Sequence, residues 1–294
     1  MPVEGTTPRM RVAVTGGSGR VGQYVVDRLM KVADVKVLDL HRPTQKVAFA
    51  ETNVLDLDAL RREFSGVDVV VHLAAIDYDL QARPEQYIHV NVQGTWNVLQ
   101  AAREAGVRRV VLCSSISACG LSEANPNFPP DFIPVDESHA DYPIQAYSVS
   151  KLLMEEMAES FVRGGDIEVI CLRLMMVLLP ENIQPTIERA ADTDSRWLFY
   201  YVTPEDCARA FECAVFAEGA RSGTFFITAE DSCRAEPTLA WVKRIFGDRI
   251  RIRDPAYYDA NPRASIFDGR RARDELGFRP SSDWLEASGG KYGG

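Results

Sequence analysis

One stretch decides the fold of this chain, and it reads VTGGSGRVG over residues 14–22. A mostly apolar run over residues 11–14 precedes it and helical spacing follows over residues 21–30, so the glycines lie at a strand-to-helix turn. Glycine lets the backbone turn tightly and approach a ligand, while the free N–H groups and positive end of the new helix attract phosphate. The turn therefore predicts a dinucleotide site with its pyrophosphate at the helix N-terminus.

A carboxylate stands where the second apolar run ends. Residues 35–38 are apolar except for Lys36, and Asp39 follows them. At this place an acid can accept hydrogen bonds from the hydroxyls of an adenosine ribose, and it would repel a 2′-phosphate. Asp39 therefore favours NAD as the cofactor, with NADP as an alternative because His41 and Arg42 lie just beyond it.

A second informative stretch, AYSVSK, covers residues 146–151. Tyr147 and Lys151 are one helical turn apart, in a segment with helical spacing, so both side chains project from one face. An unperturbed tyrosine titrates near ~10, and a neighbouring ammonium favours the phenolate. We therefore expect Lys151 to lower the pKa of Tyr147, which would carry a proton to or from a substrate oxygen.

Taken together, these stretches resemble the short-chain dehydrogenase/reductase superfamily, within its extended, NAD-dependent epimerase/dehydratase-like branch. Four further stretches carry the resemblance: VVVHLAA at 69–75, HVNVQGT at 89–95, VVLCSS at 110–115 followed by Gly120, and the tail at 268–280 with its ELGF-like turn. The likeness covers residues 11 to about 173 and the tail. It implies an α/β, Rossmann-type, doubly wound parallel sheet with a small C-terminal substrate lobe.

The resemblance also implies a role for individual residues. Ser115 would hold the substrate oxygen, Tyr147 would exchange its proton, and Lys151 would tune Tyr147 and bind the nicotinamide ribose. Asn53 stands where the family usually places an acid against the adenine, and it keeps an acceptor without the charge. The cofactor-binding residues expected from the turn, from Asp39 and from the resemblance are Gly16, Ser18, Gly19, Arg20, Val21, Gly22, Asp39, Asn53, Val54, Leu73, Ala74, Ala75, Asn91, Ser114, Tyr147 and Lys151.

Length and composition agree with this fold class. The 294 residues, 46% of them hydrophobic, suffice for one large α/β domain with a smaller elaboration. We expect residues 9–180 and 197–228 to form the dinucleotide-binding domain, with a helix over 204–216. Residues 181–196 and 229–294 would form the substrate lobe, and residues 121–143 a loop over the active site.

Charge and cysteine usage exclude several other classes of protein. A net charge of −9 and a pI near 5.1 disfavour nucleic acid as a partner. The longest apolar run, over residues 171–180, contains Arg173 and is too short to span a membrane, and the amino terminus lacks a signal-peptide pattern, so we expect a cytoplasmic protein. The six cysteines form no CxxC pair and the four histidines have no ligand spacing, so neither a disulfide nor a metal site is expected.

The segment after residues 169–174 bears on the substrate. Family members that bind nucleotide sugars usually insert a long segment there, whereas this chain reaches its next strand-like run, 197–202, within a short interval. This compactness resembles the uronate and aldose dehydrogenases of the branch. The loop MMVLLP at 175–180 is apolar, so an aliphatic or aromatic alcohol is also a possible substrate. Alternatively, these residues only pack against the edge of the sheet. Arg189 and Arg196 are the nearest basic residues that could meet a carboxylate, or else they are solvated charges.

Three functions remain open at this stage. The favoured one is an NAD(P)-dependent oxidoreductase acting on a secondary alcohol or carbonyl of a small sugar, sugar acid or similar alcohol. The alternative is a (nucleotide-)sugar epimerase with tightly bound NAD, and a cofactor sensor without catalysis is third. A dehydratase is disfavoured because Ile116 and Ser117 stand where its members place an Asp-Glu pair. Helices matching residues 84–105 and 146–163 often pair two subunits in this family, which implies a homodimer.

Overall fold

A seven-stranded sheet forms the centre of the computed structural model, which describes residues 9–121, 129–165 and 167–290. All its strands are parallel and their order is β3-β2-β1-β4-β5-β7-β8. The strands are β1 (Arg11–Thr15), β2 (Asp34–Asp39), β3 (Ala48–Glu51), β4 (Val69–His72), β5 (Arg109–Ser115), β7 (Glu168–Leu174) and β8 (Ser222–Ile227). The order reverses between β1 and β4, which confirms the predicted doubly wound sheet and locates its ligand-binding edge at the carboxyl ends of these strands.

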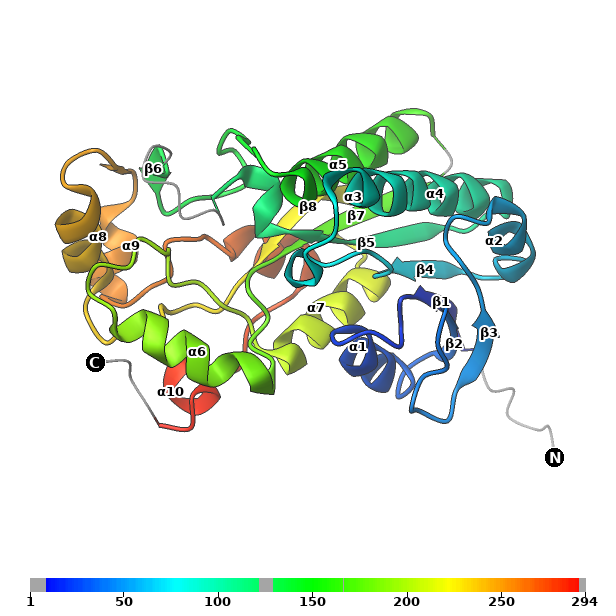
Figure 1. The fold of residues 1–294 in the computed structure, drawn as a ribbon, viewed down its shortest axis with the longest axis horizontal. Helices are drawn as coiled ribbons and strands as arrows, with labels where there is room; N and C mark the ends of the chain where they lie inside the picture. The colour runs from blue at the N-terminus through cyan, green and yellow to red at the C-terminus, as the bar shows by residue number, and fades with distance from the viewer. Residues whose placement is uncertain (1–8, 122–128, 166, 291–294) are drawn as a thin grey trace.

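Helices cover both faces of the sheet, as Figure 1 shows. Helices α2 (Leu57–Glu63), α4 (Gly94–Glu104) and α5 (Ala146–Arg163) pack on one face, and α1 (Gly22–Leu29) and α7 (Pro204–Phe216) on the other. Along β1, the side chains of Val12 and Val14 enter the core beside α1 and α7, while Ala13 enters the core beside α2, α4 and α5. Both faces are therefore apolar, as buried parallel strands require. The predicted helix over 204–216 is confirmed.

The helical segment after β4 has an irregular middle. It begins with α3 (Pro84–Tyr87), continues as the π-helical η2 (Ile88–Gln93) and ends with α4. A π-helical turn widens the backbone locally and is frequent at functional sites. Here it carries Asn91, whose side chain reaches the loop that follows β4.

The second lobe contains α6 (Pro180–Ala191), α8 (Thr238–Phe246), α9 (Pro255–Ala260), η4 (Ala272–Leu276) and α10 (Trp284–Ala287). These elements lie together at one end of the sheet in Figure 1. A two-stranded parallel sheet joins β6 (Phe132–Ile133) to β9 (Arg251–Ile252). A strand from within residues 9–180 thus pairs with one from the carboxyl-terminal segment. Of the loop expected over residues 121–143, residues 122–128 lie outside the described residues.

The expected strand over residues 197–202 is wrong. The segment is extended but makes only one isolated bridge, from Val202 to Val177, and the strand that follows β7 in the sheet is β8. One feature explains the difference. Phe199 has a φ of 54°, which takes the backbone into the left-handed region and interrupts an extended strand. The Phe199 ring instead packs edge-on against Trp241 of α8, with 5.0 Å between centroids.

Candidate active site

A cleft of ≈ 1120 Å³ lies at the carboxyl ends of β1, β4, β5 and β7. Its walls are the glycine-rich turn, the loop after β4, the start of α5, helix α6 and residues 195–200. This volume exceeds the range of about 300–1,000 Å³ typical of single drug-sized ligands. The predicted site residues that line it are Gly16, Gly19, Arg20, Val21, Gly22, Leu73, Ala75, Ser114, Ser115, Tyr147 and Lys151.

The glycine-rich turn closes so tightly that side chains are excluded. A Cβ on Gly22 would lie 2.2 Å from the carbonyl oxygen of Gly16, and a Cβ on Gly16 would lie 2.4 Å from the backbone nitrogen of Ala74. Gly16 also has a φ of +73°, which other residues rarely adopt. Val21 occupies the N-cap of α1 and has no side-chain oxygen to satisfy the N–H groups of the first turn. The turn therefore fits a pyrophosphate.

Asp39 lies beside this turn at the end of β2. One of its carboxylate oxygens accepts a hydrogen bond from the backbone N–H of Ser18 at 3.0 Å, and the other accepts from the N–H of His41 at 3.1 Å. Arg42 lies with its guanidinium over the ring of Phe49, 4.8 Å from the centroid. The carboxylate is thus held in place next to the turn, where the ribose of a dinucleotide is expected.

Six predicted residues do not line the cleft: Ser18, Asp39, Asn53, Val54, Ala74 and Asn91. Asn53 is exposed, and its side-chain oxygen accepts from the backbone N–H of Leu55 at 3.0 Å. Asn91 is buried, and its side chain forms hydrogen bonds with two neighbouring segments. Its amide accepts from the N–H of Ile76 at 2.8 Å and donates to the Ile76 carbonyl at 3.1 Å, and it also donates to Ser150 Oγ of α5 at 3.1 Å. Asn91 therefore ties the loop after β4 to the helix that carries Tyr147.

The three predicted catalytic residues meet at the end of β5. Ser115 ends the strand, and Tyr147 and Lys151 lie in the first two turns of α5. Ser115 and Tyr147 line the same part of the cleft, and Ser115 Oγ accepts from the backbone N–H of Ser117 at 3.1 Å. Lys151 Nζ donates to the carbonyl of Cys113 at 2.8 Å and lies 5.7 Å from the centre of the Tyr147 ring. This arrangement can exchange a proton with a substrate oxygen bound between the two hydroxyls.

The expectation that Tyr147 has a lowered pKa is wrong. Burial raises the pKa of Tyr147 well above its ordinary value, the charge of Asp77 adds to the rise, and the neighbouring hydroxyl of Ser115 opposes it. Lys151 is not among the main causes of this shift; its ammonium donates to the Cys113 carbonyl and lies 5.7 Å from the ring centre. Tyr147 is therefore a protonated phenol at neutral pH.

Two tyrosines and an ion-pair cluster surround Tyr147, and the sequence motifs did not reveal them. The rings of Tyr78 and Tyr87 contact the Tyr147 ring edge-on, with 5.8 and 5.7 Å between centroids. Tyr78 begins the short η1 (Tyr78–Leu80), in which Asp77 is the N-cap and Asp79 lies in the first turn. Arg20 pairs there with Asp77 at 2.6 Å and Asp79 at 3.0 Å, and it lies 3.7 Å from Glu181 of α6. Residues 77–79 lie in a loop with no periodicity, so no sequence signal could have identified this cluster.

Ser114 differs from its neighbour Ser115. Its hydroxyl donates to the carboxylate of Glu155 on α5, so it is turned into the protein although its residue borders the cleft. Ser114 thus fixes α5 against β5.

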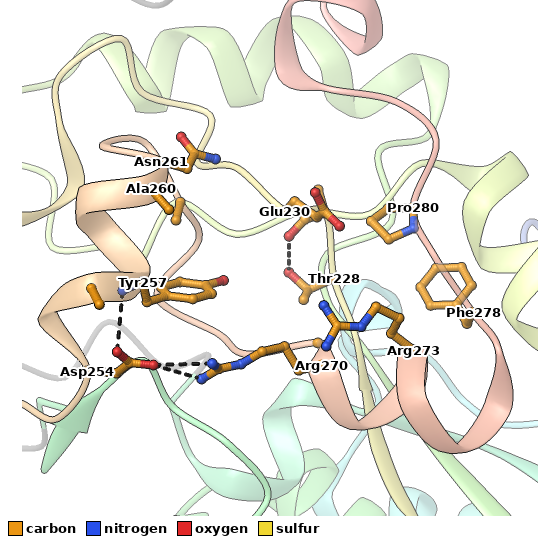
Figure 2. A pocket seen from close by; sticks show the side chains of 14 residues that line it. Thr228, Glu230, Asp254, Tyr257, Ala260, Asn261, Arg270, Arg273, Phe278 and Pro280 are labelled. Atoms are coloured by element: carbon orange, nitrogen blue, oxygen red, sulfur yellow. Dashed lines mark hydrogen bonds and ion pairs between the residues drawn. The ribbon is translucent and has the colours of Figure 1, made fainter. Parts of the chain in front are cut away.

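A second cavity, of ≈ 410 Å³, lies in the carboxyl-terminal lobe and shares no lining residue with the cleft. Figure 2 shows Tyr257 of α9 on one side of it and Phe278 on the other, with Arg273 and Glu230 between them. Arg270 also lines this cavity, but its guanidinium is paired with Asp254 and Asp268. No predicted site residue belongs to this cavity.

Other features bear on cofactors and location. All six cysteines are free thiols. Within residues 9–121, 129–165 and 167–290, no cluster of His, Cys, Asp and Glu side chains could hold a metal ion. None of the helices in this part of the chain has the length and apolar character needed to cross a membrane.

Comparisons with known proteins agree with the geometry. The family model described as "NAD dependent epimerase/dehydratase family" matches residues 12–203. L-arabinose 1-dehydrogenase (NAD(P)(+)) of Haloferax volcanii is 29% identical, over 70% of this chain and 83% of that protein. UDP-glucose 4-epimerase of Streptococcus mutans is 26% identical, over 94% of each. The structure of a short-chain dehydrogenase/reductase superfamily protein of Agrobacterium tumefaciens with bound NAD has a TM-score of 0.72, with 25% identity and 95% of both chains covered.

Proposed function

The chain belongs to the NAD-dependent epimerase/dehydratase family, and on that premise we propose that it is an NAD-dependent oxidoreductase. It would transfer hydride between exchangeable cofactor and a secondary alcohol or carbonyl of a small sugar, sugar acid or similar alcohol. The observation that carries the proposal is the convergence of Ser115, Tyr147 and Lys151 in one cleft with the glycine-rich turn. The same cleft offers a place for a dinucleotide and a proton carrier for its substrate.

NAD is the proposed cofactor and NADP the alternative. The carboxylate of Asp39 lies beside the glycine-rich turn, where it can accept hydrogen bonds from ribose hydroxyls and repels a 2′-phosphate. Arg42, stacked over Phe49, lies three residues after Asp39 and is a cation that could favour NADP.

The proposed mechanism assigns one task to each catalytic side chain. When bound, NAD supplies the acceptor for the hydride that leaves the substrate carbon. The hydroxyl of Ser115 hydrogen-bonds the substrate oxygen and holds it next to Tyr147. The Tyr147 oxygen, as phenolate, takes the alcohol proton during oxidation, and as phenol it returns a proton to the carbonyl during reduction. Lys151 lies in the same cleft, 5.7 Å from the centre of the Tyr147 ring, and would bind the nicotinamide ribose.

The alternative function is a sugar epimerase with tightly bound NAD. The similarity to UDP-glucose 4-epimerase of Streptococcus mutans over 94% of the chain supports it. Against it, the connection between β7 and α7 adds only α6 and a short extended segment. The longer segment with which nucleotide-sugar enzymes of the family grip the nucleotide has no counterpart among the described residues.

One experiment separates these functions. The protein is incubated with NAD and a panel of free sugars, sugar acids and secondary alcohols, and the near-ultraviolet absorbance of reduced cofactor is recorded. A dehydrogenase accumulates reduced cofactor in proportion to the oxidised substrate, whereas an epimerase interconverts its substrate without accumulation. Conversion of a sugar to its epimer with no net reduction of NAD would overturn the proposal.

The variant Tyr147→Phe provides the control for that assay. It retains the ring and its contacts with Tyr78 and Tyr87 but loses the proton carrier. We expect turnover to fall by roughly 10²- to 10⁴-fold while calorimetry still detects cofactor binding. Unchanged turnover would show that Tyr147 does not carry the proton.

A further inference from the structure

The substrate end of the cleft is walled by apolar side chains from two segments of the chain. Met175 and Leu179 come from the loop after β7, and Trp197 and Tyr200 come from the extended segment before α7; all four are buried. Met176 and Val177 are half-buried beside them. A free sugar placed against such a wall would lose hydrogen bonds to water without replacing them.

This apolar wall is continuous with the catalytic centre. The Tyr147 ring contacts the Tyr78 ring, and Tyr78 and Tyr200 both line the cleft. Tyr200 in turn contacts the Trp197 ring, with 5.3 Å between centroids. Two pairs of aromatic rings, Tyr147 with Tyr78 and Tyr200 with Trp197, thus line the same cleft.

Two arginines lie at the Trp197 end of this wall. The guanidinium of Arg189, on α6, lies over the Trp197 ring, 5.3 Å from its centroid, and Arg196 lines the same wall. In the part of the chain that the structure describes, no carboxylate pairs with Arg189 or Arg196. The acids that do line the cleft, Asp77 and Asp79, are both paired with Arg20.

We propose that the substrate is an amphipathic acid: a secondary alcohol or the matching ketone, with an apolar body against Trp197 and Tyr200 and an anionic group held by Arg189. A planar guanidinium suits a carboxylate, which it can bind through two parallel hydrogen bonds. The inference rests on the proposed function, because it names the substrate class of that same site. In the oxidative direction the alcohol carbon loses a hydride to NAD, the hydroxyl proton passes to Tyr147, and the carboxylate is unchanged.

The first test measures which compounds reduce NAD. It compares three apolar hydroxy acids (3-hydroxy-3-phenylpropanoate, mandelate and 3-hydroxyoctanoate) with the neutral amide of the first and with D-glucuronate. We expect at least one of the apolar acids to have a kcat/KM about tenfold or more above the amide and D-glucuronate. A preference for D-glucuronate or for the amide overturns the substrate class and leaves the proposed function standing.

A binding test decides the substrate class without catalysis. In a calorimeter, 3-phenylpropanoate, which has no hydroxyl to oxidise, and 3-phenylpropanamide are titrated into protein saturated with NAD. We expect the acid to bind about tenfold more tightly than the amide, and we expect Arg189→Gln to abolish that difference. The matched control is Arg62→Gln, which removes an exposed arginine of α2 outside the cleft and should preserve the difference.

Three results of the binding test would overturn the substrate class. They are equal binding of acid and amide to the unmodified protein, no binding of either compound, and a preference for the acid that survives in the double variant Arg189→Gln, Arg196→Gln. A different pattern identifies a failure of the proposed function instead: NAD binds in the calorimeter, yet none of the acids, sugars or neutral alcohols reduces it.

Discussion

Arg173 of β7 and Glu155 of α5 form an ion pair inside the protein, with 2.6 Å between Nη2 and Oε2 and both side chains almost inaccessible to water. Arg173 also binds Asp141 at 2.8 Å, in the segment that leads into α5, and Glu155 accepts the hydrogen bond of Ser114. Burial disfavours the charged form of Arg173, but its bonds to Glu155 and Asp141 raise its pKa above the ordinary value. The pair therefore fixes the helix that carries Tyr147 to the centre of the sheet.

Removal of one member of this pair should destabilise the protein. We expect Glu155→Ala to lower the free energy of unfolding by about 3 kcal/mol, because Arg173 would keep a buried charge with Asp141 as its remaining partner. Denaturant unfolding followed by circular dichroism measures this. Glu159→Ala is the matched control on the same helix, since its pair with Arg163 is exposed to solvent, and it should change stability by less than about 1 kcal/mol. Equal losses in the two variants would contradict the buried pair.

The raised pKa of Tyr147 predicts the pH dependence of the reaction. Oxidation requires the phenolate, so its rate should increase with pH through the neutral and into the alkaline range, while reduction requires the phenol and should decline at high pH. The charge of Asp77 contributes to the rise in the pKa of Tyr147, so Asp77→Asn should lower that pKa and move the oxidative profile to lower pH. Asp79 is a smaller contributor, and Asp79→Asn should produce a smaller shift in the same direction. A profile that moves to higher pH in Asp77→Asn would refute this electrostatic account.

The choice of cofactor should depend on Asp39. Asp39→Ala removes an acceptor for the ribose hydroxyls and the charge that repels a 2′-phosphate, so the ratio of kcat/KM for NAD over NADP should fall by about tenfold. Steady-state kinetics with both cofactors measures the ratio, and Asp39→Asn, which keeps an acceptor without the charge, should give an intermediate value. A preference of the unmodified protein for NADP would mean that the role of Asp39 is misassigned.

The outer surface of α4 and α5 predicts a homodimer. Trp96 of α4 is 44% exposed and Leu153 of α5 is 39% exposed, and these two helices pack side by side (Figure 1). We expect the double variant Trp96→Glu, Leu153→Glu to elute as a monomer in size-exclusion chromatography with light scattering, because charges would be buried at the interface. Leu285→Glu on α10, where Leu285 is 38% exposed, serves as the control and should leave the mass unchanged. A monomeric unmodified protein would contradict the prediction.

Local motifs predicted the sheet and the reacting groups because their geometry depends on near neighbours in the chain. The glycine-rich turn, Asp39 and the helical spacing of Tyr147 and Lys151 are of this kind, and the structure brings the predicted Ser115 to the same cleft. Other properties depend on packing between distant segments. The pKa of Tyr147 depends on burial and on Asp77, and residues 197–202 are prevented from forming a strand by the place of Phe199 in the core. Neither effect has a signature in a short stretch of sequence.

The position of Arg20 links the two ends of the cleft. This single guanidinium serves as counter-ion to η1 on one side and to α6 on the other, while its backbone belongs to the turn that would receive phosphate. We expect a polyphosphate at that turn to compete with Asp77 and Asp79 for the same cation, and Asp77 also contributes to the raised pKa of Tyr147. Occupancy of the turn and proton affinity of the phenol should then be thermodynamically coupled.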